Sequence, residues 1–578
     1  VKLNNIQWVE GKYYRQLAKE RTVKNFTIPA NKGNVYSADG SLLATSIPEY
    51  SIYFDAVAPS NEHFKEHIKG LSDSLAVMFD NSTGFYQAKL QKARANKSRY
   101  VFLAKKLSYT EQMRMKTFPL FNKGANKGGL IVEQKIVREH PIGLVAKRTI
   151  GYERSNEDGK GLEYAFRHYL NGKSGHRMMQ KIAKNQWKPI SDINEKEPQD
   201  GYDIISTIDV YVQDIAHHAL LKQLEHYSAD HGCVVVMETK TGHIKAISNL
   251  GRASDGSYYE TQNYAIAESQ EPGSTFKLMD LIAVIDDKKA DTSTVYDSNG
   301  GIVTYYNRKV RDSKPGGYGK ISLARGFELS SNTVLVQSVV NSYKDNPKQF
   351  VDRINSYGLN KPLGLPIEGE GKPYIPQPGT SGWSGTTLPW MAFGYNVSIT
   401  PLQTLTLYNA VANNGIMVKP IFVSEIKEWN KTIKNYNTQV INPKICSQET
   451  LDKVHAVLEN VVKKGTGSKL YSKDFSMAGK TGTAQVNYKD KSKLYYASSF
   501  VGYFPAVEPK YSCIVIVHKP NVATGYYGAD VAGPVFKRIA QKIFTDSPSM
   551  NHVKNIDAKV VSQETNYKEF YKKAEKAE

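Results

Sequence analysis

The sequence predicts a multidomain α+β protein, and three observations support this expectation. The chain has 578 residues, more than one hydrophobic core usually accommodates. Hydrophobic residues make up 40% and charged residues 23% of it, which is the balance of an ordinary globular protein. The first half is rich in strand patterns, whereas the second half alternates strands and helices. We expect a strand-rich domain over residues 1–200, a layered domain over 201–546 and a polar tail over 547–578.

The N-terminal half reads as a scaffold without a recognisable catalytic pair. Asp39-Gly40 marks a turn between two strand-like segments. Residues 60–120 carry helical patterns with many lysines, and residues 130–137 alternate like a strand. A polar stretch over residues 192–201, with Pro198, predicts the boundary to the second half.

The second half begins with a helix capped by Asp209, followed by a hairpin closed at Thr239–Gly242. A helix containing Ser274 comes next, and residues 286–400 then alternate helices with Gly- and Pro-rich loops. The predicted end of this half is three strands, Ser476–Val486, Ser498–Phe504 and Tyr511–Lys519, and a helix, Pro534–Phe544.

The net charge and the cysteine content exclude few classes of function. The formal net charge is +20, which suits nucleic acid, an anionic membrane face or another anionic polymer, and equally a solvated basic surface. No nucleic-acid-binding motif accompanies it. The three cysteines form no Cys-x-x-Cys pattern. Cys233 and Cys513 lie in strand-like runs, so we expect buried, inert thiols there.

No window contains the ~18 consecutive apolar residues that a membrane-spanning helix needs, and no signal-peptide pattern is visible. The chain begins at Val1 without an initiating methionine. We therefore expect a trimmed chain whose targeting segment lies upstream.

The first motif that carries chemistry is Ser274-Thr275-Phe276-Lys277. A serine and a lysine three residues apart lie on one helical face. Pro272 and Gly273 precede the serine and an apolar run follows, which predicts a tight turn opening a buried helix. Alone the motif is weak, since it recurs at residues 424–427 in a strand-like stretch.

Two further motifs follow Ser274 in order. Ser330-Ser331-Asn332 precedes an apolar helix, and Lys480-Thr481-Gly482-Thr483 lies in a strand-like run. A second Lys-Thr-Gly, at residues 240–242, lies at the predicted hairpin tip, where glycine is expected for the turn. The glycines Gly479 and Gly482 suggest close backbone approach, such as that of a substrate laid along an edge strand.

These residue types suit acyl transfer. Ser274 would attack a carbonyl, and Lys277, desolvated by its apolar neighbours, would take the serine proton. Ser330 would pass a proton between the lysines and the leaving amine. The backbone N–H groups of Ser274 and Thr483 would stabilise the oxyanion, a contribution of roughly 3 kcal/mol per donor.

The other polar residues of the motifs would position the reactants. Asn332 would orient Lys277 and the substrate amide. Lys480 would supply the positive potential that is expected to be the chief cause of a lowered pKa of Lys277, and it would attract a substrate carboxylate. Thr481, Gly482 and Thr483 would bind the substrate along the strand.

The three ordered motifs resemble those of the class B penicillin-binding proteins, the peptidoglycan DD-transpeptidases. The resemblance extends over nearly the whole chain. It includes, in the first half, Asp39-Gly40-Ser41-Leu42-Leu43-Ala44, Arg138 to Pro141 and Gly161-Leu162-Glu163, and in the second half Gly394-Tyr395-Asn396 and Gly465-Thr466-Gly467. It implies an N-terminal pedestal of the dimerisation type and a penicillin-binding domain, a five-stranded antiparallel sheet flanked by helices with a helical subdomain.

Within class B, the sequence looks most like the division-specific FtsI type, through Leu43-Ala44-Thr45-Ser46 and residues 499–506. One departure is Lys32-Gly33, where the family usually has Arg-Gly. This departure concerns the contacts that the arginine makes in the pedestal and leaves the predicted chemistry unchanged.

The resemblance implies crosslinking of peptidoglycan stem peptides that end in D-Ala-D-Ala, and acylation of Ser274 by β-lactams. It implies partners, a membrane glycosyltransferase and division proteins, but no nucleic acid, cofactor or metal. The implied location is the bacterial inner membrane, with a single-pass N-terminal anchor absent from this chain and a periplasmic catalytic domain. The pair His217-His218 falls beside apolar residues on a helix, so we interpret it as structural.

Several alternatives stay open. An elongation-type class B transpeptidase shares all three motifs. A β-lactamase or a β-lactam sensor shares them too, but no residue is identifiable as the base for rapid deacylation. A bifunctional enzyme would need acidic glycosyltransferase motifs in the first half, and none is apparent.

Overall fold

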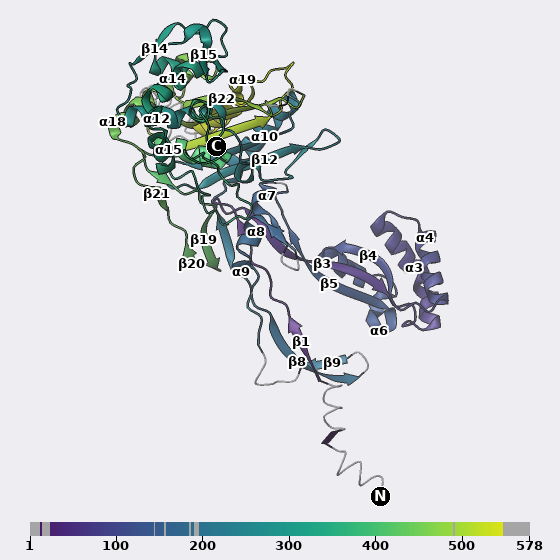
Figure 1. Ribbon diagram of the computed structural model, residues 1–578. Helices are drawn as coiled ribbons and strands as arrows, with labels where there is room; N and C mark the ends of the chain where they lie inside the picture. The colour runs from purple at the N-terminus through teal and green to yellow at the C-terminus, as the bar shows by residue number, and fades with distance from the viewer. Residues whose placement is uncertain are drawn as a thin grey trace, which may run out of the picture. The chain divides into compact units, whose positions relative to one another are not determined.

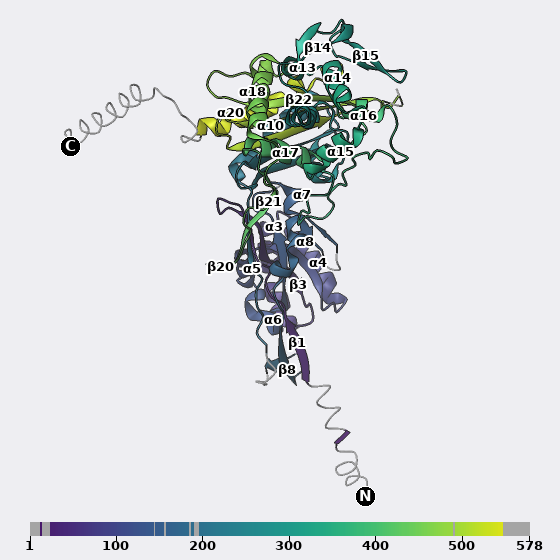
Figure 2. The same ribbon diagram turned by 60° about the vertical axis from the view of Figure 1, so that its left-hand side comes forward.

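The structure is a computed structural model that describes residues 12–13, 23–143, 145–154, 158–183, 186–189, 196–488, 490 and 492–546. The predicted polar tail, 547–578, lies outside the described residues. The chain forms two compact units that are interleaved in sequence. The first contains residues 1–35, 42–143 and 168–203, and the second contains residues 36–41, 144–167 and 204–578. Figures 1 and 2 show the two units as ribbons.

The first unit is built around the long strand β3 (Leu42–Phe54). It pairs antiparallel with β4 (Val101–Leu107) and β5 (Leu130–Glu139). Three helices, α3 (Asn61–Phe79), α4 (Thr83–Ala95) and α5 (Tyr109–Lys116), share one hydrophobic core with these strands. Each helix starts where a serine hydroxyl accepts a backbone N–H of the first turn: Ser60, Ser82 and Ser108.

A separate three-stranded antiparallel sheet completes the first unit. It contains β1 (Val23–Ile28), β8 (Gly175–Ala183) and β9 (Gln186–Pro189), with β8 in the middle. The strand-rich character expected for the N-terminal half is confirmed, with the helices predicted around residues 60–120 added to it.

The second unit contains an antiparallel sheet in the order β13-β12-β11-β24-β23-β22. Five strands match those expected: β11 (His231–Glu238), β12 (Ile244–Arg252), β22 (Ala478–Val486), β23 (Tyr495–Phe504) and β24 (Tyr511–His518). The sixth, β13 (Tyr258–Tyr259), was not predicted, because two residues are too short to show a period. It pairs with Gly251 and Arg252 at one edge, which leaves β22 at the other.

Helices cover both faces of this sheet. The helices α10 (Val210–His226) and α20 (Gly533–Asp546) share a core with Val234 and Cys513. On the other face, Asn409 of the fully buried α17 (Pro401–Ala412) accepts a hydrogen bond from Ser512 at 2.7 Å. Because side chains alternate along a strand, Ser512 and Cys513 point to opposite faces. The layered arrangement predicted from the sequence is confirmed.

The segment between β13 and β22 also supplies a group of helices beside the sheet (Figures 1 and 2). They include α12 (Lys277–Asp286), α13 (Leu323–Glu328), α14 (Asn332–Tyr343), α15 (Pro347–Ser356) and α18 (Gln448–Lys464). The recurring Ser-x-x-Lys at residues 424–427 lies in a strand, β19 (Val423–Glu428), as expected.

Cys233 and Cys513 are buried free thiols, as predicted, and so is Cys446. Burial raises the pKa of the Cys446 thiol to about 12, and it raises that of Cys233 as well. Among the described residues, no helix is both long and apolar enough to cross a bilayer.

Candidate active site

Ser274 lies in a short 3-10 turn, Gly273–Thr275, directly before α12. We expected Ser274 in the first turn of the α-helix. The α-helix begins later because Gly273 has a φ of +58°, whereas residues of a right-handed α-helix have negative φ. The Thr275 hydroxyl donates to the carbonyl of Pro272 at 2.9 Å, which closes the turn. The turn thus holds the half-buried Ser274 just before the N-terminus of the buried helix α12.

Two outside contacts fix this turn. The N–H of Gly273 donates to the carbonyl of Gly394 at 3.1 Å. The hydroxyl of Tyr408, on α17, donates to the carbonyl of Thr275 at 2.9 Å. The backbone around the serine is therefore held from two sides.

Lys277 is the first residue of α12 and is fully buried. Its Nζ atom donates to the carbonyl of Ser330 at 2.8 Å and to the Ser330 hydroxyl at 3.3 Å. It also donates to Oδ1 of Asn332 at 2.7 Å. The first two sequence motifs therefore meet at this lysine.

Burial lowers the pKa of Lys277 to about 7, against the opposing charges of Asp312 and Asp280. We had expected Lys480 to be the main cause, whereas burial is the largest. Asp280 lies one turn further along α12 and is itself fully buried, which raises its pKa. Neither of its carboxylate oxygens has a hydrogen-bond partner among the described residues.

The segment carrying Ser330 and Asn332 is fixed by Asp312. Its carboxylate accepts hydrogen bonds from the Ser331 hydroxyl at 3.0 Å and from the N–H of Thr333 at 3.0 Å. Ser331 also caps α14, and Ser330 adopts a left-handed φ of +56°. Sequence reasoning missed Asp312, since an aspartate in a loop between short strands carries no motif.

Lys480 lies on the edge strand β22 and is fully buried. Its Nζ atom donates to the carbonyl of Thr481 at 3.0 Å and lies 5.5 Å from the centre of the Phe327 ring. Burial, and then the charge of Lys277, lower the pKa of Lys480 well below its usual range. Lys277 thus contributes to the lowered pKa of Lys480, whereas Lys480 is not among the causes of the lowered pKa of Lys277.

The glycines that flank Lys480 allow the close approach that the sequence suggested, and part of it is made by the protein itself. A Cβ on Gly479 would lie 2.6 Å from the carbonyl oxygen of Val501. A Cβ on Gly482 would lie 2.2 Å from Oγ of Ser499 and 3.0 Å from the Thr275 side chain. The close approach is that of β23 and of the turn around Ser274, so these glycines allow the protein to pack against itself.

A cavity of about 270 Å³ joins the three motifs. Its lining includes Ser274, Ser330, Asn332, Thr481 and Thr483. Lys277 and Lys480 do not line it, because both are fully buried. The structure thus brings Ser274, Ser330 and the threonines of β22 to one solvent-connected space, with the two lysines behind its wall.

Sequence reasoning missed the other side chains around this cavity. Thr466 bonds through its hydroxyl to that of Thr481 at 2.6 Å, and Thr483 accepts the N–H of Gly528 at 3.0 Å. An ion pair between Lys469 and Asp530, 2.6 Å long, also lines the cavity. The sequence around Thr466 contributed to the family resemblance, which is the one signal that could have found this residue.

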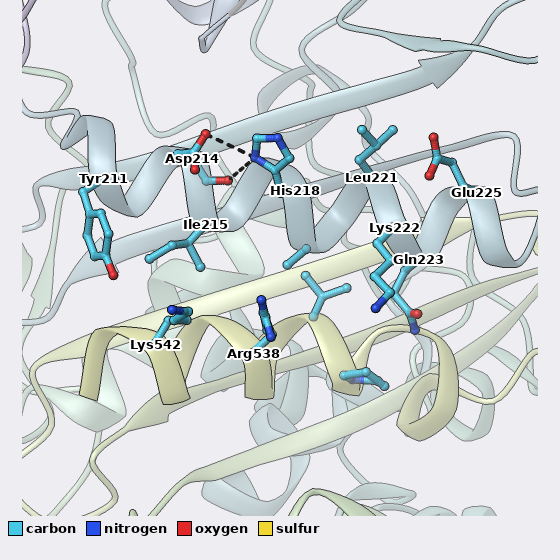
Figure 3. A pocket seen from close by; sticks show the side chains of 13 residues that line it. Tyr211, Asp214, Ile215, His218, Leu221, Lys222, Gln223, Glu225, Arg538 and Lys542 are labelled. Carbon is cyan, nitrogen blue, oxygen red and sulfur yellow. Dashed lines mark hydrogen bonds and ion pairs between the residues drawn. The ribbon is translucent and has the colours of Figure 1, made fainter. Parts of the chain in front are cut away.

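A larger groove, of about 740 Å³, lies between α10 and α20 (Figure 3). Apolar and charged side chains both line it, among them Ile215, Leu221, Lys222 and Arg538. An ion pair of 3.2 Å joins His218 and Asp214 there. It contains none of the predicted site residues. Volume alone therefore does not identify the site.

The fold and the grouped motifs define a class of proteins, those that carry Ser-x-x-Lys, Ser-x-Asn and Lys-Thr-Gly around one cavity of an α+β domain. Residues 232–541 match the family model described as penicillin binding protein transpeptidase domain, and residues 27–206 match the penicillin-binding protein dimerisation domain. The chain belongs to this family, and the resemblance to the class B penicillin-binding proteins is confirmed.

Similar proteins agree with this assignment. Stage V sporulation protein D of Bacillus subtilis is 26% identical over 93% of this chain and 82% of its own length. Peptidoglycan D,D-transpeptidase FtsI of Escherichia coli is 24% identical over 93% of this chain and 88% of its own. The crystal structure of penicillin binding protein 2X from Streptococcus thermophilus has the same fold, with a TM-score of 0.72 at 20% identity, over 93% of this chain and 82% of that one.

Proposed function

We propose that this chain is a serine-acyl D,D-transpeptidase that crosslinks peptidoglycan stem peptides and is acylated by β-lactams. One observation carries the proposal. The buried Lys277, with a pKa lowered to about 7, contacts Ser330 and Asn332 at the wall of the cavity that Ser274 lines. A lysine that is partly neutral near pH 7 is suited to accept a serine proton.

The first step makes an acyl-enzyme. Oγ of Ser274 attacks the carbonyl between the two terminal D-alanines, and Lys277 accepts the hydroxyl proton. The C–N bond of the tetrahedral intermediate then breaks. A proton relayed through Ser330 reaches the leaving nitrogen, and D-alanine departs as a free amine.

The second step reverses this order of events. An amine of a neighbouring stem peptide attacks the ester carbonyl and loses a proton to the same relay. The C–O bond to Ser274 breaks, and the proton returns to the serine oxygen. The product is a new amide crosslink and a regenerated enzyme. A β-lactam enters the first step in the same way, but its ring opening leaves no departing group.

The remaining motif residues have supporting roles in this proposal. Asn332 orients Lys277 and the substrate amide. Lys480 contributes positive potential toward the substrate carboxylate. The backbone N–H groups of Ser274 and Thr483 stabilise the oxyanion, and Thr481 and Gly482 bind the donor peptide along the edge strand.

We further propose that the enzyme acts in septal cell-wall synthesis. Several relatives are named FtsI, which supports this assignment, while the Bacillus relative is named for stage V of sporulation. We propose residues 1–200 as its pedestal and 201–546 as its transpeptidase domain. An N-terminal anchor would hold it in the inner membrane beside a glycosyltransferase and division proteins. Depletion that yields filaments supports the septal role, and loss of rod shape would favour the elongation type.

Mass spectrometry after benzylpenicillin treatment tests the core of the proposal. The expected result is a covalent adduct of one penicillin on the wild-type chain and none on Ser274→Ala. An adduct that persists in the variant, or is missing from the wild type, would overturn the assignment. The lifetime of the adduct separates the alternatives, since rapid release of hydrolysed drug would identify a β-lactamase.

A further inference from the structure

A cluster of metal-ligating side chains lies in the second unit, outside the cavity around Ser274. Its members are His231, the first residue of β11, His518, the last residue of β24, and Glu268, which follows α11 (Tyr264–Ala267). One ligand atom from each of these three residues lies within 4.8 Å of the others. His231 and His518 are brought together because they are paired in the sheet register.

The distances fit a small divalent cation. Nε2 of His231 lies 3.1 Å from Oε2 of Glu268, and Nε2 of His518 lies 3.5 Å from the same oxygen. Zn²⁺ binds nitrogen and carboxylate oxygen at ~2.0–2.2 Å in tetrahedral geometry, which places neighbouring ligand atoms about 3.3 Å apart. The histidine–carboxylate spacings are therefore close to those of a metal site.

His518 provides an independent observation. Its side chain is only 2% exposed, and neither ring nitrogen has a hydrogen-bond partner among the described residues. An unsatisfied buried polar group is costly, so such atoms usually have a partner. Nε2 of His518 faces Glu268, which is 26% exposed and so gives an ion access from solvent.

The surroundings of His231 are those of a metal ligand. Its Nδ1 atom lies 2.8 Å from a carboxylate oxygen of Asp230. A carboxylate on Nδ1 fixes the tautomer that leaves Nε2 free to coordinate, an arrangement typical of zinc-binding histidines. The ring is also held between those of Tyr264 and His518, each with its centre 4.2 Å away.

We propose that His231, Glu268 and His518 form a binding site for Zn²⁺, with Asp230 as the positioning residue of His231. Two imidazoles and a carboxylate are a donor set that zinc prefers and magnesium does not. A bound ion would draw the two Nε2 atoms together, tilting the rings out of their stack. It would tie the ends of β11 and β24 to the segment that leads into the turn of Ser274. The cluster carries no sequence motif, because Glu268 lies 37 residues from His231 and His518 comes from the far end of the domain.

Zinc titration of the full chain, prepared without a histidine tag and stripped of metal with EDTA, tests the site. Competition with a chromophoric chelator should give one equivalent of Zn²⁺ per chain, and Co²⁺ should give the visible absorption of tetrahedral nitrogen–oxygen coordination. Zinc should also raise the melting temperature, because it binds the folded state. Mg²⁺ should not compete.

Variants locate the ion. Glu268→Gln and His518→Gln should each weaken zinc binding by about 100-fold or more, and Asp230→Asn by about 10–100-fold, the usual effect of losing a carboxylate behind a ligand. His218→Gln is the matched control, since it removes an exposed histidine paired with one carboxylate, and its affinity should equal that of the wild type. If His518→Gln fails to fold, the partly exposed Glu268→Gln decides alone. Absence of stoichiometric binding, or wild-type affinity in Glu268→Gln, overturns the proposal.

Discussion

Nζ of Lys277 lies 2.7 Å from Oδ1 of Asn332, and the other end of the same amide is also occupied. Nδ2 of Asn332 donates to the carbonyl of Arg311 at 2.7 Å. Because both ends of the amide have partners, its oxygen is fixed toward the lysine and its nitrogen away from it. Asn332 therefore holds Lys277 beside Ser330 in one orientation.

Removing this amide should slow acylation without unfolding the protein. A hydrogen bond to an ionisable group contributes about 1.5–3 kcal/mol, so Asn332→Ala should lower the rate constant for acylation by a fluorescent penicillin about 10–150-fold. The control is Asn442→Ala, which removes a similar bond, from Nδ2 to the carbonyl of Ser356 at 2.9 Å, away from the cavity. Equal rates in the two variants would contradict the role given to Asn332.

Acylation should depend on pH through Lys277. Burial lowers its pKa to about 7, so the lysine is protonated below that pH and cannot accept the Ser274 proton. The opposite charges of Asp280 and Asp312 act against this lowering, and the charge of Lys277 in turn lowers the pKa of Lys480. We expect the acylation rate constant to rise about tenfold per pH unit below pH 7 and to level above it. A profile that is flat between pH 5.5 and 9 would exclude Lys277 as the base.

The order of the three motifs, and the helices and strands that carry them, could be predicted from the sequence. The second Lys-Thr-Gly, at residues 240–242, and the second Ser-x-x-Lys, at residues 424–427, were correctly distinguished from the motifs of the site. Hairpin turns and strands leave local patterns in the sequence, and these two matches lie in such elements. Local pattern could not place Asp312 or Thr466. Each acts through a contact made only when distant segments pack together.

The glycines of β22 show a second limit of sequence reasoning. Gly479 and Gly482 did signal close approach, but the sequence could not say of what. In the structure, β23 and the turn around Ser274 occupy the positions that the two Cβ atoms would take, and β22 lies at the edge of the sheet. Desolvation of Lys277 was expected, but its rank above Lys480 as the cause of the lowered pKa was not, since the extent of burial is set by the whole fold and a motif does not show it.

Gly394 should be intolerant of substitution, because the backbone before Ser274 leaves it no room. It has a φ of +83°, and a Cβ would lie 2.0 Å from the carbonyl oxygen of Gly273. Strain from the left-handed backbone and overpacking together should lower the free energy of unfolding of Gly394→Ala, measured with urea, by roughly 2–5 kcal/mol. The variant should also be acylated more slowly.

Gly379 is the matched control for this prediction. Its φ of +85° is nearly the same, but a Cβ there would meet nothing within 4 Å. Gly379→Ala should therefore cost only about 1 kcal/mol and leave acylation unchanged. If both variants lose the same stability, conformational strain explains the loss and the contact with Gly273 does not matter.

Arg353 should stabilise the helices behind the site. It joins α15 to the end of α12 through ion pairs with Asp286, at 3.3 Å, and with Asp287. Asp286 also accepts hydrogen bonds from the N–H of Ser447 at 2.8 Å and from the Thr450 hydroxyl at 2.9 Å, at the start of α18. Arg353→Ala leaves two half-buried carboxylates without their cation, so we expect a loss of about 1–3 kcal/mol in the free energy of unfolding.

The loss caused by Arg353→Ala should shrink in acid. Burial raises the pKa of Asp286, but its hydrogen bonds and the charge of Arg353 outweigh this and hold the pKa below the usual value. The stabilisation is therefore present above about pH 4 and disappears as the pH falls through the lowered pKa. Lys348→Ala is the control on the same helix, because its pair with Asp352 is exposed and should contribute less than about 0.5 kcal/mol. Urea unfolding at pH 7 and at about pH 2, below the lowered pKa, measures both variants. A deficit for Arg353→Ala that is equal at the two pH values would show that packing, rather than charge, accounts for its effect.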